Sequence, residues 1–141
     1  QDVMNLLIHL ADIAHNSKDT EISYRWTILL YEEFFEQGDV EKQAGKSPSF
    51  LCDRATTNIS KSQIGFIKFV ISPSFDLLFN LIPETKNYHD NVQSNLKFWE
   101  DTFEREEALE KSKEVEKLHE GEKEKEKEKE KIRNSTFLKN N

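Results

Sequence analysis

The stretch KSQIGFIKFVISPSF, residues 61–75, indicates the fold class of this chain. Ile64, Ile67, Val70 and Ile71 recur at spacings of three and four residues, which places them on one face of an α-helix. Pro73 has no backbone N–H and its ring clashes with the preceding turn, so we expect it to kink or end this helix before SFDLLFNLIP continues. The stretch therefore predicts a helix with an apolar, buried face.

The start of the same stretch contains two residues that are unusual in a core helix, Gln63 and Gly65. SKSQ at residues 60–63 is typical of a capping box, in which Ser60 is the N-cap and Gln63 reaches back to its amide. On this interpretation the helix opens at Ser60 and Gln63 has a structural role. The pattern leaves open whether the Gln63 amide also recognises a ligand.

Helical spacing continues on both sides of this stretch. The first apolar stripe consists of Val3, Leu6, Leu7, Leu10, Ala11 and Ala14. In residues 21–39 the side chains predicted to face inward are Ile22, Trp26, Leu29, Leu30 and Phe34, and Gly38 is predicted to end that helix. Residues 42–58 predict a loop and residues 88–103 a last amphipathic helix. Because no alternating strand pattern occurs, the predicted fold class is all-α.

Composition divides the chain near Glu104. The 141 residues are 33% charged with a net charge of −7, which suits one modest domain. Residues 1–103 predict that domain, and residues 104–141 a charged low-complexity tail. In EKEKEKEKEK each charge meets an opposite sign at i+3 and a like sign at i+4, so the attractions largely cancel. We expect an exposed, fraying helix or disorder, acting as a solvated extension or as a partner-binding tail.

The remaining composition favours the cytoplasm. The single cysteine, Cys52, has no partner for a disulfide within the chain, and the first sixteen residues lack the basic region typical of a signal peptide. We expect no membrane-spanning segment, and no nucleic-acid partner because a basic patch is lacking. The sequons at Asn58 and Asn134 are interpreted as chance matches.

Asp12 is the first candidate for chemistry, because it lies in an otherwise apolar helix. A carboxylate is costly to bury unless a cation or hydrogen-bond donors compensate, so Asp12 is either a metal ligand or a surface residue. His9 lies one turn earlier and could bind the same metal ion, but the pair is weak evidence for a metal site. The glutamates at 32, 33 and 36 are typical of an exposed helix face. No nucleophile elbow, phosphate-binding glycine loop or paired-cysteine zinc motif occurs.

Four blocks of sequence carry a family resemblance: HLADIAHN, YRWTILLYEEFFEQGDVEKQAG, FLCDR and KSQIGFIKFVISPSF. Their order and spacing resemble the C-terminal part of the class I cyclic nucleotide phosphodiesterase catalytic domain, over residues 1–103. The resemblance implies the C-terminal helices of a multi-helix domain. It also implies a fragment of a metal-dependent phosphohydrolase that converts the 3′,5′-cyclic nucleotides cAMP and/or cGMP to 5′-nucleoside monophosphates in signal transduction.

The resemblance also implies roles for individual residues. Asp12 matches the last aspartate ligand of a centre of two divalent ions, typically zinc with magnesium or manganese. Gln63 matches the glutamine whose amide hydrogen-bonds the purine edge. Phe66 matches the aromatic residue that stacks on the purine, and Leu30 the aliphatic residue on its other side. From its size alone, and not from the resemblance, we expect Gly65 to be small because a larger side chain would meet a neighbouring helix.

The sequence departs from the family in ways that limit these expectations. The upstream metal-binding histidines and the histidine that protonates the leaving oxygen have no counterpart, so no catalytic residue is assigned and the fragment alone is expected to be inactive. His15 and Ser23 replace a small polar residue and a tyrosine of relatives, so the preference between cAMP and cGMP is not predicted. The resemblance is compatible with a homodimer of the full-length protein, and with its membrane attachment through upstream segments. The competing hypothesis is a non-catalytic helical interaction module with a partner-binding tail.

Overall fold

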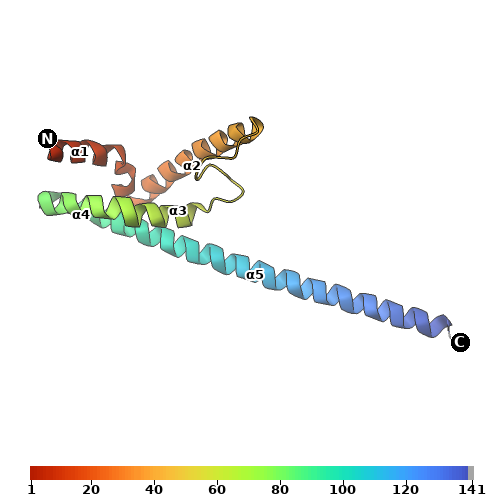
Figure 1. Cartoon of the computed structure of the whole chain (residues 1–141). Coiled ribbons are helices and arrows are strands. Elements are labelled where there is room, and N and C mark those ends of the chain that lie inside the picture. The colour runs from red at the N-terminus through yellow and green to blue at the C-terminus, as the bar shows by residue number, and fades with distance from the viewer. Residues whose placement is uncertain (140–141) are drawn as a thin grey trace. The chain divides into compact units, whose positions relative to one another are not determined.

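The computed structural model describes the backbone of residues 1–139 and the side chains of residues 1–121, 123, 125 and 127. All regular structure within these residues is helical, which confirms the all-α prediction (Figure 1). The α-helices are α1 (Asp2–Asp12), α2 (Thr20–Gln43), α3 (Ile59–Phe66), α4 (Ser72–Leu81) and α5 (Lys86–Lys139). The short elements are the 3-10 turns η1 (Ala14–Ser17) and η3 (Pro83–Thr85) and the π-helical turn η2 (Ile67–Ile71). The chain divides into two compact units, Gln1–Phe103 and Glu104–Asn141, and α5 contributes to both.

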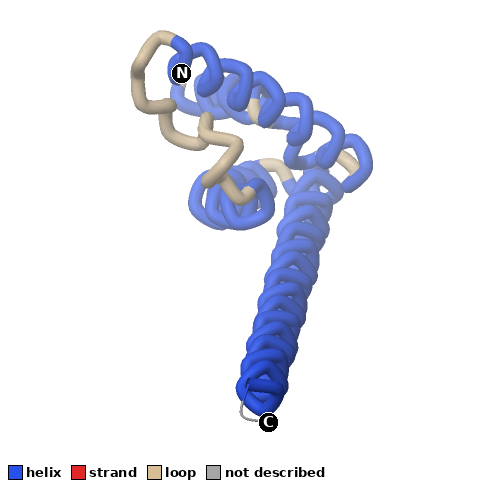
Figure 2. The backbone as a smooth tube through the Cα atoms, turned by 90° about the vertical axis from the view of Figure 1, so that its right-hand side faces the viewer, coloured by secondary structure: helices blue, strands red, loops and turns tan. Residues whose placement is uncertain are grey.

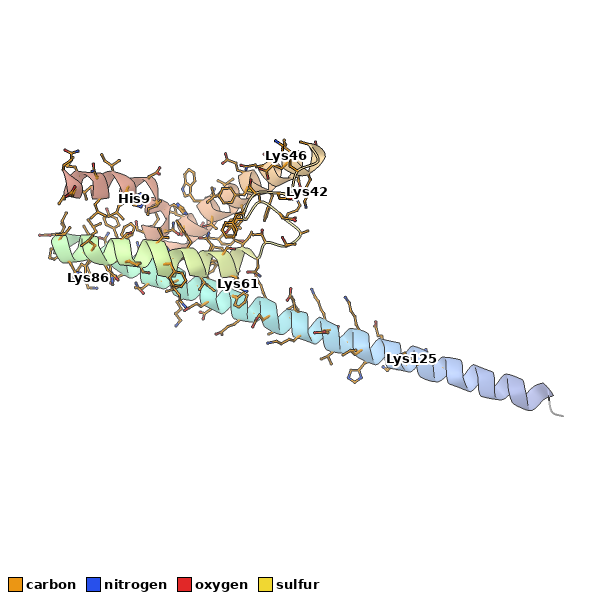
Figure 3. All side chains as sticks on the ribbon, in the orientation of Figure 1. His9, Lys42, Lys46, Lys61, Lys86 and Lys125 are labelled. Carbon is orange, nitrogen blue, oxygen red and sulfur yellow. The ribbon has the colours of Figure 1, made fainter. Side chains whose placement is uncertain are left out.

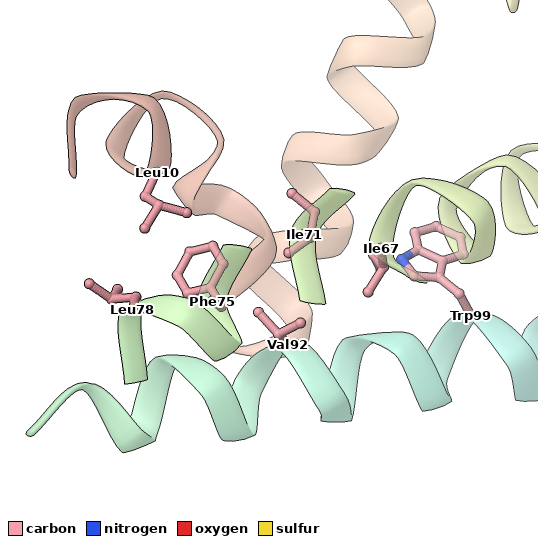
Figure 4. Close-up of a cluster of buried hydrophobic side chains, with 7 residues drawn as sticks. All are labelled: Leu10, Ile67, Ile71, Phe75, Leu78, Val92 and Trp99. Atoms are coloured by element: carbon pink, nitrogen blue, oxygen red, sulfur yellow. The ribbon is translucent and has the colours of Figure 1, made fainter. Parts of the chain in front are cut away.

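The hydrophobic core of the first unit is formed around η2. Its members are Leu10 from α1, Ile67 and Ile71 from η2, Phe75 and Leu78 from α4, and Val92 and Trp99 from α5 (Figure 4). Ile67 and Ile71 are fully buried, as their spacing predicted, whereas Val70 is 37% exposed. Burying each large apolar side chain contributes about 1.5–3 kcal/mol, so this cluster fixes η2 between its neighbouring helices.

Helical structure continues through Pro73. The π-helical turn η2 immediately precedes α4, and Pro73 lies in the first turn of α4. A proline in the first turn of a helix costs little hydrogen bonding, because the backbone N–H groups of that turn have no partner within an isolated helix. The wider turn before it accommodates the change in hydrogen bonding, so the predicted break is a local widening of the helix.

The segment Ile59–Leu81, which comprises α3, η2 and α4, corrects one expectation. It is long and apolar enough to cross a membrane by length and composition alone, whereas the sequence was expected to contain no such run. A core helix of a soluble domain has the same properties. Ile67, Ile71, Phe75 and Leu78 from this segment lie in the hydrophobic core of the first unit.

Gly38 does not end the second helix. α2 continues past it to Gln43, and Gly45 follows the C-cap Ala44 with a φ of +72°. That left-handed conformation is the one in which glycine commonly terminates helices. Gly38 is instead buried within α2, where a Cβ would lie 1.8 Å from the backbone oxygen of Cys52. The loop of residues 44–58, drawn in tan in Figure 2, therefore passes directly over Gly38.

The predicted inward face of α2 is also wrong. Ile22, Trp26 and Leu29 are 45%, 58% and 56% exposed, and Leu30 and Phe34 are half-buried. The buried residues of α2 are Ser23, Thr27, Tyr31 and Gly38. Small side chains on this face allow close approach of neighbouring backbone, as at Gly38. The apolar stripe of α2 thus faces away from the core that the described residues form.

The second unit is a charged helix. The backbone is helical to Lys139, and all side chains of residues 104–120 are exposed, in agreement with a solvated helix. Apolar residues are not protected there, since Leu109, Val115 and Leu118 are each more than half exposed. Asn134 lies outside the residues whose side chains are described.

Candidate functional site

The start of α3 tests the capping-box interpretation of Gln63. The helix begins at Ile59, one residue before the predicted start, and its N-cap is Asn58. The Asn58 Oδ1 accepts a hydrogen bond from the Lys61 backbone N–H at 2.6 Å. Asn58 therefore performs the capping that was assigned to Ser60, which lies inside the helix. Gln63 is no longer at the third helical position, so the capping-box interpretation is wrong.

Gln63 instead lies buried in α3 with an unsatisfied acceptor. The residue is 4% exposed, and its side-chain oxygen Oε1 is buried without a hydrogen-bond partner among the described residues. Leaving a buried acceptor unpaired costs about 1–3 kcal/mol, and proteins rarely tolerate it without a reason. An N–H donor from a ligand or from another polypeptide would remove this cost.

The other predicted base-binding residues lie on two different helices. Phe66 is the last residue of α3, three positions after Gln63, and it is half-buried against the hydrophobic core. Residues three apart on a helix lie on one face, so Gln63 and Phe66 share a side of α3. Leu30 is half-buried in the middle of α2. Its placement opposite Phe66 stays a prediction.

Gly65 lies between Gln63 and Phe66 and corrects a further expectation. A Cβ built at this position has nothing within 4 Å, so no described helix requires a glycine there. The expected steric reason for Gly65 is therefore wrong within this chain.

A hollow of about 500 Å³ lies beside the same helix. Residues of the loop 44–58 line it together with Lys61 and Ser62 of α3. Figure 3 labels Lys61 on α3 and Lys42 towards the end of α2. Gln63, Phe66 and Leu30 are not among the lining residues, so this hollow is distinct from the predicted base-binding residues.

Asp12 is the last residue of α1 and is exposed. The described residues give it no hydrogen bond or ion pair, so its carboxylate is accessible. His9, labelled in Figure 3, is also exposed on α1. No group of three or more His, Cys, Asp or Glu side chains within the described part of the chain is arranged to hold a metal ion. These residues supply at most part of a metal centre.

Two asparagines that the sequence analysis did not identify fix the turn after Asp12. The Asn95 side-chain amide of α5 donates to the backbone oxygens of Asn16 and Lys18 at 2.8 and 2.9 Å. The Asn91 amide donates to the Ser17 oxygen at 3.0 Å. The pairs are 74 or more residues apart in sequence, so no local pattern reveals them. Their repeated spacing of four residues on α5 is the only sequence signal.

His15 lies within the turn that these asparagines hold. Burial lowers the pKa of its imidazole, which favours the neutral ring near pH 7. The Asn16 side-chain amide donates to His15 Nε2 at 3.1 Å, which requires that this ring nitrogen be unprotonated. A neutral His15 adds no positive charge near Asp12.

We expect Asn95→Ala to lower the free energy of unfolding by about 1–3 kcal/mol, because the Asn16 carbonyl stays buried without its donor. Urea denaturation of the 141-residue chain measures this loss. Asn87→Ala is the matched control, since Asn87 is exposed on the same helix. Equal stability of the two variants would contradict a structural role for the Asn95 amide.

Comparison with known proteins identifies the family. Residues 1–92 match the sequence profile of 3′,5′-cyclic nucleotide phosphodiesterases, so the chain belongs to this family, as the residue blocks predicted. The dual specificity calcium/calmodulin-dependent 3′,5′-cyclic nucleotide phosphodiesterase 1 of Drosophila melanogaster is 45% identical over 82 residues. The dual specificity calcium/calmodulin-dependent 3′,5′-cyclic nucleotide phosphodiesterase 1B of Bos taurus is 49% identical over 75 residues. Members of the family are generally metal-dependent hydrolases.

A solved structure supports the same fold. The structure of LmjPDEB1 in complex with IBMX superposes with a TM-score of 0.65 and 32% sequence identity, over 72% of this chain. The matched part is a minor portion of each known protein. It is 31% of the LmjPDEB1 chain, 10% of the fruit-fly enzyme and 14% of the bovine enzyme. The match to the fruit-fly enzyme covers 58% of this chain, and the match to the bovine enzyme covers 53%.

Proposed function

We propose that this chain is the base-binding part of an enzyme that hydrolyses 3′,5′-cyclic nucleotides, cAMP and/or cGMP, to 5′-nucleoside monophosphates in signal transduction. Family membership supports the reaction class, and the names of both relatives describe dual specificity. The chain by itself is proposed to be inactive, because Asp12 has no partner ligands among the described residues.

The observation that carries this proposal is the unsatisfied Oε1 of buried Gln63. A purine edge presents N–H donors and nitrogen or oxygen acceptors, and a side-chain amide offers one group of each kind. A base that donates to Oε1 would remove the cost of the unpaired acceptor. Because an amide can be turned over, one glutamine would serve adenine or guanine. Gln63 is therefore proposed to read the base.

Phe66 and Leu30 are proposed to hold the base between them. Phe66 shares a side of α3 with Gln63, so a base that contacts the amide would lie close to the ring. Stacking of a base on an aromatic side chain is worth about 1–3 kcal/mol. The half-buried state of Phe66 and Leu30 leaves part of each side chain available for contact.

Asp12 is proposed to supply one ligand of a centre of two divalent ions, zinc with magnesium or manganese. Its exposed carboxylate fits an oxygen ligand, while the remaining ligands must come from residues outside the described part of the chain. Such ions, when bound, polarise the phosphoryl group and supply hydroxide near neutral pH. Gln63, Phe66 and Leu30 contribute orientation and affinity for the base.

The experiment that tests this function is a chimera. Residues 1–103 of this chain replace the matching segment in the catalytic domain of the Drosophila melanogaster relative, and hydrolysis of cAMP and cGMP is measured separately. We expect divalent-metal-dependent turnover. A folded but inactive chimera would contradict the proposed function and favour the alternative of a non-catalytic interaction module.

In the same chimera we expect Gln63→Ala to raise the KM for cyclic nucleotides with a smaller effect on kcat. Losing a hydrogen bond to the base raises KM about tenfold for each 1.4 kcal/mol. Phe66→Ala is expected to act in the same direction through lost stacking. Gln93→Ala, at an exposed position of α5, is the control. An unchanged KM with a lowered melting temperature would show that Gln63 serves only stability.

A cytoplasmic location and a homodimer of the full-length protein are further proposals. Cell fractionation tests the first and sedimentation velocity the second.

A further inference from the structure

One face of α5 holds the chain shortly after Asp12. Tyr88, Asn91 and Asn95 lie at i, i+3 and i+7, so their side chains share a face of this helix. We call these three residues the retaining stripe. All three contact residues 16–18, at the end of η1. The two asparagine amides donate hydrogen bonds to the three backbone oxygens of this segment, and the Tyr88 ring centroid lies 5.9 Å from the ammonium group of Lys18.

The hydrogen bonds of the retaining stripe lie partly in the protein interior. Asn95 is buried, and so are Asn16 and Ser17 in the segment that it holds. The Asn95 side-chain oxygen has no hydrogen-bond partner among the described residues, which costs stability. Its amide nitrogen uses both of its N–H groups on backbone oxygens, those of Asn16 and Lys18. Asparagine at position 95 is therefore useful to the fold through its nitrogen, as a fixed pair of donors.

Asp12 is anchored on both sides, although its own side chain is exposed. Two residues before it, Leu10 is buried in the hydrophobic core together with Val92 of α5 (Figure 4). Val92 lies between Asn91 and Asn95 in sequence, so α5 contacts the chain on both sides of Asp12. A binding group must be held within about 0.5 Å of its productive position by the residues around it. A carboxylate that only faces solvent has no such requirement.

We infer that the retaining stripe sets the divalent-metal affinity of the Asp12 site, by fixing the backbone from which Asp12 presents its carboxylate. This inference rests on the proposed function, in which Asp12 is one ligand of the metal centre. Tyr88, Asn91 and Asn95 are positioning residues, because they act through the segment of residues 16–18. Groups that orient a metal ligand typically contribute about ten- to a hundred-fold to metal affinity. Contacts that act through the backbone belong at the lower end of this range.

The test uses Asn95→Leu in the chimera, because leucine has the branched shape of asparagine but no N–H donor. Mn²⁺ is titrated into the metal-stripped protein at a temperature at which circular dichroism shows every variant folded. We expect Asn95→Leu to raise the dissociation constant for Mn²⁺ about tenfold. Asn91→Leu removes one hydrogen bond in place of two and should raise it less. Asn91→Gln keeps an amide at this half-buried position and should restore the affinity.

Two controls separate positioning from stability. Asn87→Leu changes an exposed asparagine of α5 that is not in the retaining stripe, and Leu78→Ala removes a buried core side chain of α4. Both should bind Mn²⁺ as tightly as the parent chimera, although Leu78→Ala should lower the melting temperature. The inference is overturned if Leu78→Ala weakens Mn²⁺ binding as much as Asn95→Leu does. It is also overturned if Asn95→Leu and Asn91→Leu both bind Mn²⁺ like the parent.

Kinetics provide a readout that a loss of stability would not produce. In Asn95→Leu, kcat should be low at limiting Mn²⁺ and should recover when Mn²⁺ exceeds the raised dissociation constant. The KM for the cyclic nucleotide should change little, in contrast with Gln63→Ala, whose raised KM excess Mn²⁺ should not repair. A kcat of Asn95→Leu that stays low in excess Mn²⁺ would count against positioning.

The outcomes for the proposed function and for the retaining stripe can be told apart. A folded, inactive chimera whose Mn²⁺ affinity depends on Asn91 and Asn95 removes the hydrolytic function and leaves the positioning role. An active chimera with the same Mn²⁺ affinity in every variant removes the positioning role and leaves the function. A folded chimera that binds no Mn²⁺ overturns both.

Discussion

Replacing Gly38 by alanine is expected to destabilise the first unit by about 3 kcal/mol or more, because the added methyl group overpacks a contact that has no free space. The new Cβ would lie 1.8 Å from the Cys52 backbone oxygen and 2.7 Å from its carbonyl carbon. Both are backbone atoms, so a change of rotamer gives no relief. Either the loop of residues 44–58 or α2 itself must move.

The loop is held on α2 by other contacts, which limits its movement. Arg54 donates to Asp39 from Nε and Nη2, and Lys42 pairs with Asp53 at 2.7 Å. The hydrogen bond from Arg54 lowers the pKa of the Asp39 carboxyl, so this pair persists near neutral pH. Exposed ion pairs stabilise little individually. Together these two pairs connect Asp53 and Arg54 of the loop to α2.

Urea denaturation of the 141-residue chain measures the expected loss. Gly65→Ala is the matched control, since a Cβ at Gly65 meets nothing within 4 Å. Gly65→Ala should stabilise the chain by about 0.5–1 kcal/mol, because alanine loses less conformational freedom in a helix. The two glycine variants should therefore change stability in opposite directions. A Gly38→Ala protein as stable as the wild type would show that the loop does not contact α2 there.

Asp12→Ala in the chimera is expected to abolish hydrolysis of cAMP and cGMP alike, with a loss of several orders of magnitude. The proposed role of Asp12 concerns the phosphate end that both nucleotides share, and the loss of a catalytic metal's stabilisation is of order several kcal/mol. The expected defect is in kcat, in contrast with the KM defect of Gln63→Ala. The two substitutions therefore separate the phosphate end from the base end.

A measurement besides activity is required for Asp12. Metal content of the purified chimera, determined by mass spectrometry, should fall in Asp12→Ala while the melting temperature stays close to that of the parent. Asp19→Ala is the control, because Asp19 is an exposed carboxylate at the start of α2 that makes no side-chain capping bond. An Asp12→Ala chimera with normal metal content and normal turnover would show that Asp12 is an ordinary surface residue.

Local features of the chain could be predicted from the sequence alone. The spacing of Ile67 and Ile71 predicted a buried helical face, and both residues are fully buried. The absence of strand patterns predicted the all-α fold, and the residue blocks predicted the family. These features depend on chemistry repeated at the period of one element, which a sequence displays directly.

Features that depend on a second segment could not be predicted in this way. Gly38 was expected to end a helix, yet its role is set by a loop oxygen that approaches from Cys52. Gln63 was expected to close a capping box, yet the N-cap is Asn58, two positions before the predicted N-cap Ser60. The reason for Gly38 lies in a contact with a distant segment, while the role of Gln63 in binding a base stays a prediction.

The burial of α2 shows most clearly which features the sequence determines and which ones the tertiary structure decides. Its sequence determines that Ile22, Trp26 and Leu29 lie on one side of the helix and that Ser23 and Thr27 lie on another. Which side is covered depends on what packs against it, and the described residues cover the side with the hydroxyl groups. Likewise, Asn95 binds backbone oxygens 77 and 79 residues earlier in the chain. Periodicity fixes the faces of a helix, but only the tertiary structure assigns each face a neighbour, because burial is a property of two surfaces in contact.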